Sequence, residues 1–496
     1  MPVNGSCNGG VPNLSHHLSQ EGRERLPNPM KHIWTRIAKK PNMITLANGE
    51  PHSTLFPISR IDVQVPAVTD THIVDQVLSG TAPQQTLTSL KGGDCALDLS
   101  VALQYSSGLG CAATIERVKE LNEVLHCPHH NDVVLTLGNA DGVTKCFRLL
   151  GDRGDTFLIE EYSFPGLVNA PLAQGIRWAP LKMDAQGIIP SEMEQVLRTW
   201  NEETQGRRPR VLYTIPVGQN PTGSTLSIER RRRIYEIARE FDIIILEDDP
   251  YYFLQYGATD SKDEFKAMSP TFLSMDVEGR VIRIDTFSKT LVPGIRLGWI
   301  TCNAMFAQKL LLLTDSTTQH TNGFSQALVC ELLTPGRGWG IPGFLTWTQS
   351  LCTEYKRRRD FFMALLEKYV VSTGYAKSTL PEAGMFFWIE VLLDKHPRRR
   401  GAQPFENGDG KECDKVVDAR LMDSLADFVF ERGLAIMPAV SFAIMPEHQV
   451  HAGRSATQNM HPSGLNFFRA TFAGQDETME AGLKILGCAL VDFFES

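Results

Sequence analysis

A lysine and an arginine stand seven residues apart in the stretch DTFSKTLVPGIRLGW, residues 285–299. The apolar run VIRIDTF leads into Lys289, whose neighbours Ser288 and Thr290 carry hydroxyls, and Arg296 follows a Pro-Gly turn. Hydroxyls and a guanidinium can hold a phosphate while the amine attacks a carbonyl, which is what a lysine Schiff base with pyridoxal phosphate requires. An exposed loop with a solvated lysine and arginine fits this stretch alone equally well.

Two other polar segments directly follow apolar runs. In GQNPTG, residues 218–223, Asn220 precedes a proline, so its backbone is held extended and its amide can reach the phenolic oxygen of a pyridoxal ring. In EDDPYY, residues 247–252, a buried carboxylate needs a cationic partner, and a protonated ring nitrogen would serve Asp249. Tyr252, three residues later, can reach the ring oxygen. A plain turn at Asn220 and solvated acids are the alternatives.

Residues in three further segments suit the same ligand. Gly138 and Asn139 open a helix directly after a strand, where free backbone N–H groups and the helix dipole favour a phosphate. Phe164 stands in a loop and can lie flat on a planar ring, although a core phenylalanine is commoner. Arg469 lies in the apolar run FFRATFA, and its planar fork matches a carboxylate, with an internal salt bridge as the alternative.

The segments that carry these residues alternate between strand and helix patterns. We expect strands at 132–138, 156–161, 176–181, 211–216, from 243, at 281–288 and at 297–301. We expect helices at 112–124, 139–150, 191–200 and 228–241. Strands that are apolar throughout and are mostly followed by helices indicate a mostly parallel α/β sheet sandwiched by helices. Binding residues of such a sheet lie at the carboxyl ends of its strands.

The pattern changes beyond about residue 335. Long helices are expected at 345–369, 419–432 and 477–494, with strands near 385–391 and 467–471. We therefore expect an N-terminal arm, a large domain and a smaller α+β domain, with the boundaries 1–45, 46–335 and 336–496. Two polar segments rich in Gly and Pro, 395–415 and 447–464, indicate surface loops, and no prediction is made for residues 60–95.

Composition narrows the class of protein. The 496 residues carry a formal net charge of −8, which argues against a nucleic-acid partner. The 10 cysteines include no Cys-x-x-Cys pair and no Cys/His cluster at zinc spacing, so we expect reduced thiols, a cytoplasmic location and no metal. Residues 1–25 have no apolar signal core, and no run approaches the length of a membrane span.

Jointly, GQNPTG, EDDPYYFLQ, DTFSKTLVPGIRLGW and FFRATFA resemble the class I and II aminotransferases of fold type I, which use pyridoxal phosphate. The chain is most similar to the fungal aromatic amino acid aminotransferases and next to the kynurenine/2-aminoadipate aminotransferases. The resemblance runs from LANGEP almost to the C-terminus. It implies ping-pong transamination between tryptophan, phenylalanine or tyrosine and a 2-oxo acid, either 2-oxoglutarate or an aromatic pyruvate.

The resemblance also implies roles around the cofactor ring. Lys289 would form the aldimine with the cofactor and move the proton of the substrate α-carbon. Asp249 would pair with the ring nitrogen, and Asn220 and Tyr252 would bind the ring oxygen. Phe164 occupies the place where the family stacks an aromatic residue on the ring.

Further roles concern the phosphate and the substrate. The implied phosphate ligands are Thr286, Ser288, Arg296 and the backbone of Asn139 and Ala140. Relatives carry small polar residues where this chain has Asn-Ala-Asp, so Ala140 could contribute only its backbone. Arg469 would bind the substrate α-carboxylate, and Asn220 and Gly49 would also bind the substrate. Tyr105, in LQYSSGLG, would reach the phosphate from the other subunit, which implies a homodimer.

The choice of substrate side chain rests on position alone. Met30, Trp34 and Leu55 could line an apolar slot, and Lys31 or Arg36 could receive the distal carboxylate of glutamate or aminoadipate.

Two other functions share some of these features. A fold-type I lyase or decarboxylase would keep every cofactor residue. A regulator built on an aminotransferase-like domain would need an N-terminal DNA-binding helix-turn-helix, for which residues 1–45 are too short and too polar.

Overall fold

Seven strands form the main sheet, in the order β3-β11-β10-β9-β8-β4-β5. In that order they are β3 (Asp132–Thr136), β11 (Gly298–Cys302), β10 (Val281–Thr286), β9 (Ile244–Asp248), β8 (Val211–Thr214), β4 (Thr156–Glu160) and β5 (Arg177–Leu181). All neighbours pair in parallel except β11, which is antiparallel to both β3 and β10. The expected mostly parallel sheet is confirmed. This computed structural model describes residues 12–37, 40, 42–47, 49–257, 268–400, 410–444 and 464–495.

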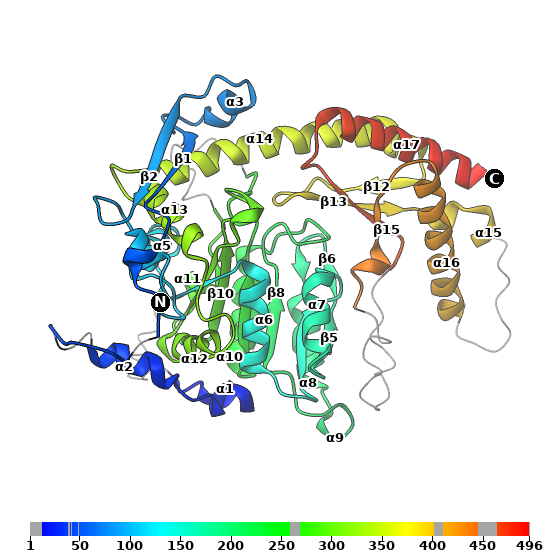
Figure 1. Cartoon of the computed structure of the whole chain (residues 1–496). Helices are drawn as coiled ribbons and strands as arrows, with labels where there is room; N and C mark the ends of the chain where they lie inside the picture. Colours follow the sequence, from blue (N-terminus) through cyan, green and yellow to red (C-terminus); the bar gives the residue numbers. More distant parts are fainter. Residues whose placement is uncertain are drawn as a thin grey trace, which may run out of the picture.

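Helices cover both faces of this sheet (Figure 1). One face packs against α6 (Asn139–Leu150), α7 (Pro165–Leu172) and α12 (Ala304–Asp315). The other packs against α5 (Ala112–His126), α8 (Pro190–Arg198), α10 (Ile228–Glu240) and α13 (Gly323–Leu333). Short elements lie in the connections: α4 (Leu99–Ala102), α9 (Glu202–Gln205), α11 (Phe272–Met275), β6 (Met183–Asp184) and β7 (Gly187–Ile188). Because both faces are covered, the strands need apolar residues at nearly every position.

A second, antiparallel sheet lies beside the main one (Figure 1). Its strands, in spatial order, are β12 (Ala376–Ser378), β13 (Phe386–Val391), β15 (Phe467–Thr471) and β14 (Met437–Pro438). The helices of this part are α14 (Gly340–Tyr369), α15 (Pro397–Arg400), α16 (Gly410–Glu431) and α17 (Asp476–Glu495). The expected α+β character is confirmed, while the domain boundaries at 45/46 and 335/336 stay predictions.

One loop prediction in this part is wrong where the chain is described. Residues 397–400 form α15, and α16 begins at Gly410, so much of 395–415 is helical. A short polar helix and a polar loop have the same composition, so composition alone does not distinguish them. Residues 401–409 and 447–463 lie outside the described residues.

The N-terminal part packs onto the main sheet through the buried Leu14 and Leu18 and through polar contacts. It contains α1 (Gln20–Glu24), α2 (Pro29–Ile37), α3 (Ile73–Leu78) and a hairpin of β1 (Arg60–Pro66) with β2 (Gln84–Leu90). Before α1, His16 Nε2 lies 2.6 Å and His17 Nε2 3.0 Å from the carboxylate of Asp242. These contacts tie the first described residues to the turn that precedes β9.

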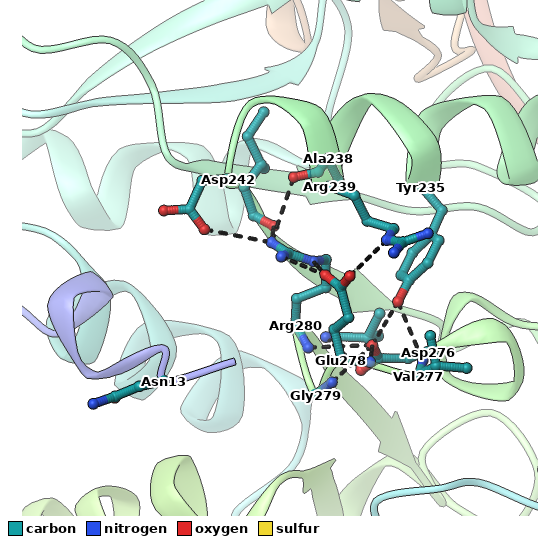
Figure 2. A network of polar contacts seen from close by, with 12 residues as sticks. Asn13, Tyr235, Ala238, Arg239, Asp242, Asp276, Val277, Glu278, Gly279 and Arg280 are labelled. Carbon is teal, nitrogen blue, oxygen red and sulfur yellow. Dashed lines mark hydrogen bonds and ion pairs between the residues drawn. The ribbon is translucent and has the colours of Figure 1, made fainter. Parts of the chain in front are cut away.

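A polar network braces the amino ends of β9 and β10 (Figure 2). The carboxylate of Asp276 accepts hydrogen bonds from the backbone of Gly279 and Val281 and from the hydroxyl of Tyr235, each at 2.9 Å. Arg280 donates to the backbone oxygen of Ile243 at 3.0 Å, which links the start of one strand to the next. The predicted site residues lie at the opposite ends of these strands.

Candidate active site

Lys289 lies in the turn that follows β10, at the carboxyl edge of the main sheet. Its side chain is half-buried, and burial lowers its pKa, with further lowering by the positive charges of Arg296 and Arg469. The neutral amine is therefore more populated than in a free lysine. A neutral amine is what a nucleophile or a proton acceptor at this position needs.

The end of β10 and the loop after it carry hydroxyls beside a guanidinium. Thr286 Oγ1 lies 2.8 Å from Ser288 Oγ. Arg296 has a left-handed backbone, with φ of 46°, and its Nη2 donates to the backbone oxygen of Leu137 at 2.7 Å. A Cβ atom on Gly138 would lie 2.5 Å from that Nη2, so only glycine leaves room for the arginine. The guanidinium thus lies beside the start of α6.

Helix α6 begins at this same edge. Gly138 is its N-cap, with φ of 92° and no side-chain hydrogen bond to the first turn, and Asn139 and Ala140 are the first two helical residues. Backbone N–H groups in a first turn have no partner within their helix. Together with the dipole and Arg296 they make a seat for an anionic group, which supports the predicted phosphate site.

Asn220 and Arg469 come from the two different sheets and meet at the site. Arg469 Nη1 donates to Asn220 Oδ1 at 2.9 Å, and Asn220 also hydrogen-bonds the hydroxyl of Tyr251. The Arg469 guanidinium carbon lies 4.6 Å from the ring centre of Phe386 and 4.7 Å from that of Phe442. The arrangement presents a cation between aromatic faces, a setting suited to a carboxylate that carries an aromatic side chain.

Asp248, the last residue of β9, supplies the carboxylate of this edge. One of its oxygens accepts a hydrogen bond from the side-chain amide of Asn139, and the other from the hydroxyl of Tyr213 at 2.7 Å. Burial raises the pKa of Asp248 to about 6, although these two hydrogen bonds oppose the rise. The acid therefore lies directly beside the predicted phosphate seat.

The structure places Asp249 and Tyr252 apart from the group of side chains described above. Asp249 Oδ2 lies 2.9 Å from Arg283 Nη1, and the Tyr252 ring centre lies 4.8 Å from the guanidinium carbon of the same arginine. Asp249 points to the sheet face away from α6, because side chains alternate along an extended chain, and Tyr252 packs in the core on that same face. Leu246 packs in the core on the α6 face. Asp248 is two residues further along the strand, so its side chain lies on that same face. Tyr251, three residues after Asp248, is the tyrosine that contacts Asn220.

Comparison with known proteins agrees with this geometry. The family described as aminotransferase class I and II matches residues 96–484. The L-tyrosine:2-oxoglutarate aminotransferase amt1 of Serpula lacrymans is 46% identical, over 97% of this chain and 96% of its own.

The chain belongs to the class I and II aminotransferases.

Two other comparisons extend the finding. An aromatic amino acid aminotransferase of Schizosaccharomyces pombe is 37% identical to this aminotransferase, over 83% of this chain and 92% of its own. The crystal structure of aminotransferase Aro8 from Candida albicans superposes with a TM-score of 0.85 at 31% identity, over 98% of this chain and 99% of that one. The family resemblance and the fold-type I architecture are confirmed.

The residues of this aminotransferase fit pyridoxal phosphate, on which the family depends. The site offers an amine, an anion seat, a carboxylate and an amide within one group of connected side chains. Two polar atoms in it, Asn139 Oδ1 and Arg469 Nε, are buried without a hydrogen-bond partner in the described part of the chain. Burying a polar atom without a hydrogen bond costs free energy, so these two atoms indicate a site that binds a polar ligand.

Three predicted residues of the aminotransferase are not joined to this group by any contact described above. Phe164 caps α7 with 38% of its surface exposed. Tyr105 is 55% exposed and lies edge-on to His320, with ring centres 6.2 Å apart. Gly49 is exposed, and nothing lies within 4 Å of where its Cβ would be. Their roles in ring stacking, in the partner's site and in substrate binding stay predictions.

The arm residues suggested for specificity differ in their surroundings. Lys31 Nζ donates to Asp315 at 2.6 Å and to the backbone oxygen of Ser106 at 2.9 Å, so its charge is already partnered within the protein. The exposed members of this set are Met30, Arg36 and Leu55. The side chain of Trp34 lies outside the described residues. Among the helices that the structure describes, none is long and apolar enough to span a bilayer.

Proposed function

We propose that this aminotransferase moves the amino group of an aromatic L-amino acid (tryptophan, phenylalanine or tyrosine) to a 2-oxo acid, 2-oxoglutarate or an aromatic pyruvate. The observation that carries the proposal is near-full-length similarity to two fungal enzymes named L-tyrosine:2-oxoglutarate aminotransferases. They come from Serpula lacrymans and Tapinella panuoides and are 46% and 45% identical over 97% of this chain. The aromatic faces of Phe386 and Phe442 around Arg469 support an aromatic substrate.

The cofactor would be held by the residues that meet at the carboxyl edge. Arg296 and the start of α6 would take the phosphate, with the hydroxyls of Thr286 and Ser288 beside them. Asp248 would face the ring nitrogen, and Asn220 and Tyr251 the ring oxygen. When bound, pyridoxal phosphate supplies a carbonyl that takes up the amino group and a ring that withdraws electrons from the α-carbon.

Three residues of the chain would have separate roles in the reaction. Arg469 would bind the α-carboxylate bidentately and so fix the α-carbon. Lys289 would take the proton from that carbon through Nζ and deliver it to the carbon that takes up the amino group. Burial and two arginines lower the pKa of Lys289, which favours the neutral amine that this role needs. Asp248, as a carboxylate, would favour a protonated ring nitrogen by direct charge attraction.

A second candidate is 2-aminoadipate or kynurenine as donor. The mitochondrial kynurenine/alpha-aminoadipate aminotransferase of Mus musculus is 34% identical over 76% of this chain and 84% of its own. The ion pair of Lys31 with Asp315 weakens one of the two positions suggested for a distal carboxylate.

A panel of amino donors, each with 2-oxoglutarate or phenylpyruvate as acceptor, tests both candidates. Aromatic donors should give the highest kcat/KM, and formation of the oxo acid should require the acceptor. Preference for aminoadipate or kynurenine would support the second candidate. Product formed without any acceptor would indicate a lyase or decarboxylase.

A homodimer with shared active sites is part of the proposal. Several large apolar residues of the arm and its surroundings are strongly exposed in the single chain: Leu26 at 83%, Ile44 at 94%, Leu46 at 99% and Leu55 at 78%. Exposed apolar surface of this kind marks an interaction site, and a second copy would cover it. Eight cysteines whose side chains the structure describes, from Cys95 to Cys488, are free thiols, which supports the proposed cytoplasmic location.

A further inference from the structure

Tyr213 lies behind Asp248 and is held firmly in place. It is the third residue of β8, is completely buried, and its ring packs edge-on to Phe147, with centres 5.6 Å apart, and at a tilt to Trp178 at 6.3 Å. Its hydroxyl donates to Asp248 Oδ2 at 2.7 Å. Because neighbouring rings fix the tyrosine, the position of this donor is fixed as well.

The hydroxyl of Tyr213 is the donor of this hydrogen bond, and the charges around the contact favour that direction. Burial, followed by the nearby Asp248 carboxylate, raises the pKa of Tyr213 well above its usual value, so the hydroxyl keeps its proton and donates. Burial raises the pKa of Asp248 to about 6, and hydrogen bonds from Tyr213 and Asn139 act against that rise. Each donor stabilises the charged carboxylate more than the protonated acid.

The two donors also fix the orientation of the carboxylate. Asn139 bonds one oxygen of Asp248, and Tyr213 bonds the other, so the group is held against rotation from both sides. Asn139 belongs to the helix start that would hold the phosphate, whereas Tyr213 lies in the core, and its hydroxyl contacts the site at Asp248. Sequence patterns gave no hint of Tyr213 beyond a polar atom in the otherwise apolar run VLYTIP.

We propose that Tyr213 is a positioning residue that keeps Asp248 ionised and aimed at the ring nitrogen of the bound cofactor. The inference rests on the proposed assignment of Asp248. On this proposal, Tyr213 lowers the pKa of Asp248 from within the core, without contacting the cofactor or the substrate.

The test is Tyr213→Phe, which keeps the ring and removes only the donor. Loss of one hydrogen bond to a charged group favours the protonated acid by about tenfold, so the pKa of Asp248 should rise by about one unit. The acid limb of the profile of kcat/KM against pH should then move to higher pH by about the same amount. In direct titrations of the apoenzyme at neutral pH, the dissociation constant of pyridoxal phosphate should increase several-fold, up to about tenfold.

Tyr235→Phe is a matched control. Its hydroxyl also donates to a buried carboxylate, that of Asp276 at 2.9 Å, but it lies at the opposite edge of the sheet (Figure 2). The control should lower the melting temperature while leaving the acid limb and the cofactor dissociation constant unchanged. Tyr213→Met, whose flexible apolar side chain can fill the same space, serves as a second variant and should show the same two shifts as Tyr213→Phe.

The outcomes separate this inference from the proposed function. If Asp248→Asn weakens cofactor binding but both Tyr213 variants keep the wild-type acid limb and dissociation constant, the positioning role is overturned. If Asp248→Asn itself binds pyridoxal phosphate as well as the wild type does, the assignment of Asp248 to the ring nitrogen fails first. A shift of the acid limb in Tyr235→Phe equal to that in Tyr213→Phe would also overturn the inference, because the effect would then be general.

Discussion

Lys289 has two arginines among its charged surroundings, and its chemistry depends on them. Burial and the charges of Arg296 and Arg469 lower its pKa, so part of its reactivity comes from side chains on other elements. Lys289→Ala should reduce turnover by at least about 10³-fold, because Lys289 is the amine proposed to move the α-carbon proton. Turnover and the visible absorbance of lysine-linked cofactor are the two measurements, and both should be lost together.

An exposed lysine supplies the control for that variant. Lys182 lies on the surface and pairs with Glu192 at 3.2 Å, away from the site. Lys182→Ala should retain wild-type turnover and absorbance. Normal turnover in Lys289→Ala would refute the assignment of the catalytic amine.

Arg469 allows charge and geometry to be tested separately. Arg469→Ala should weaken binding of the substrate α-carboxylate by about 1.5–3 kcal/mol, the range for a hydrogen bond to a charged group. Arg469→Lys keeps the charge but loses the planar fork, so it should recover only part of that loss. The KM values for an aromatic donor and for 2-oxoglutarate measure the effect, and unchanged values in Arg469→Ala would show that the arginine serves packing with Phe386 and Phe442.

Residue types and motif positions predicted much of the site, but not the side on which each residue lies. Three predicted residues stand in motifs that each offer a single side chain of the required type: Lys289, Asn220 and Arg469. In EDDPYY three acids compete, and the sequence context favours Asp249 although the alternation of β9 turns Asp248 towards the site. To choose between adjacent acids, one must know which residues of the strand face the site. In β9 this is decided by packing against α6, which the sequence does not show.

At the scale of elements, β9 and β10 carry a buried cluster of charges on the face away from α6. Arg283 donates to Asp249 at 2.9 Å and to the two oxygens of Asp285 at 2.9 and 2.8 Å, with no exposed surface of its own. Arg283→Met would leave buried acids without their cation and should lower the free energy of unfolding by about 3–5 kcal/mol. Urea denaturation measures this. Arg239→Met, at an exposed pair with Glu278, should cost about 1 kcal/mol or less, and equal losses would argue against the cluster.

Glu160, at the end of β4, should make the free energy of unfolding depend on pH. Burial raises the pKa of Glu160 from 4.5 to about 7, against the hydrogen bonds from Thr214 and the Ile215 backbone. The folded state then binds a proton that the unfolded state has already lost, so stability from this group declines as pH rises from about 4.5 to about 7. In Glu160→Gln this decline should be absent, and the variant should gain up to about 3 kcal/mol relative to wild type between pH 4.5 and 8. Urea midpoints that change in parallel with pH for both proteins would contradict this expectation.

The elements themselves were predictable where apolar runs are long. The predicted helix 139–150 has the observed bounds of α6, and the predicted strands of the main sheet fall within a few residues of those observed. The hairpin of β1 and β2 was not predictable, because its strands RIDVQVP and QQTLTSL alternate between exposed and partly buried side chains and carry many polar residues. Local pattern therefore identifies strands with two covered faces better than strands with one.

At the scale of the whole molecule, the site exists only because two sheets meet. Arg469 comes from the second sheet, and its partner Asn220 is 249 residues away in the chain. No local signal links such residues, so only the joint resemblance of the motifs predicted that they act together. The same limit applies to Tyr105, whose proposed role requires a second copy of the chain.

Mixed dimers test that role directly. Tyr105 is 55% exposed in the single chain, and the apolar residues around the arm would be covered by a partner. If Tyr105 completes the partner's site, a dimer of one Lys289→Ala subunit and one Tyr105→Ala subunit has one site with both defects and one intact site. Random pairing then restores about a quarter of wild-type activity, since half of the dimers are mixed and each has one good site of two. Activity at limiting pyridoxal phosphate, measured after co-refolding and after size-exclusion chromatography, gives the result. If Tyr105 served its own subunit, every site would keep one defect and mixing would restore nothing.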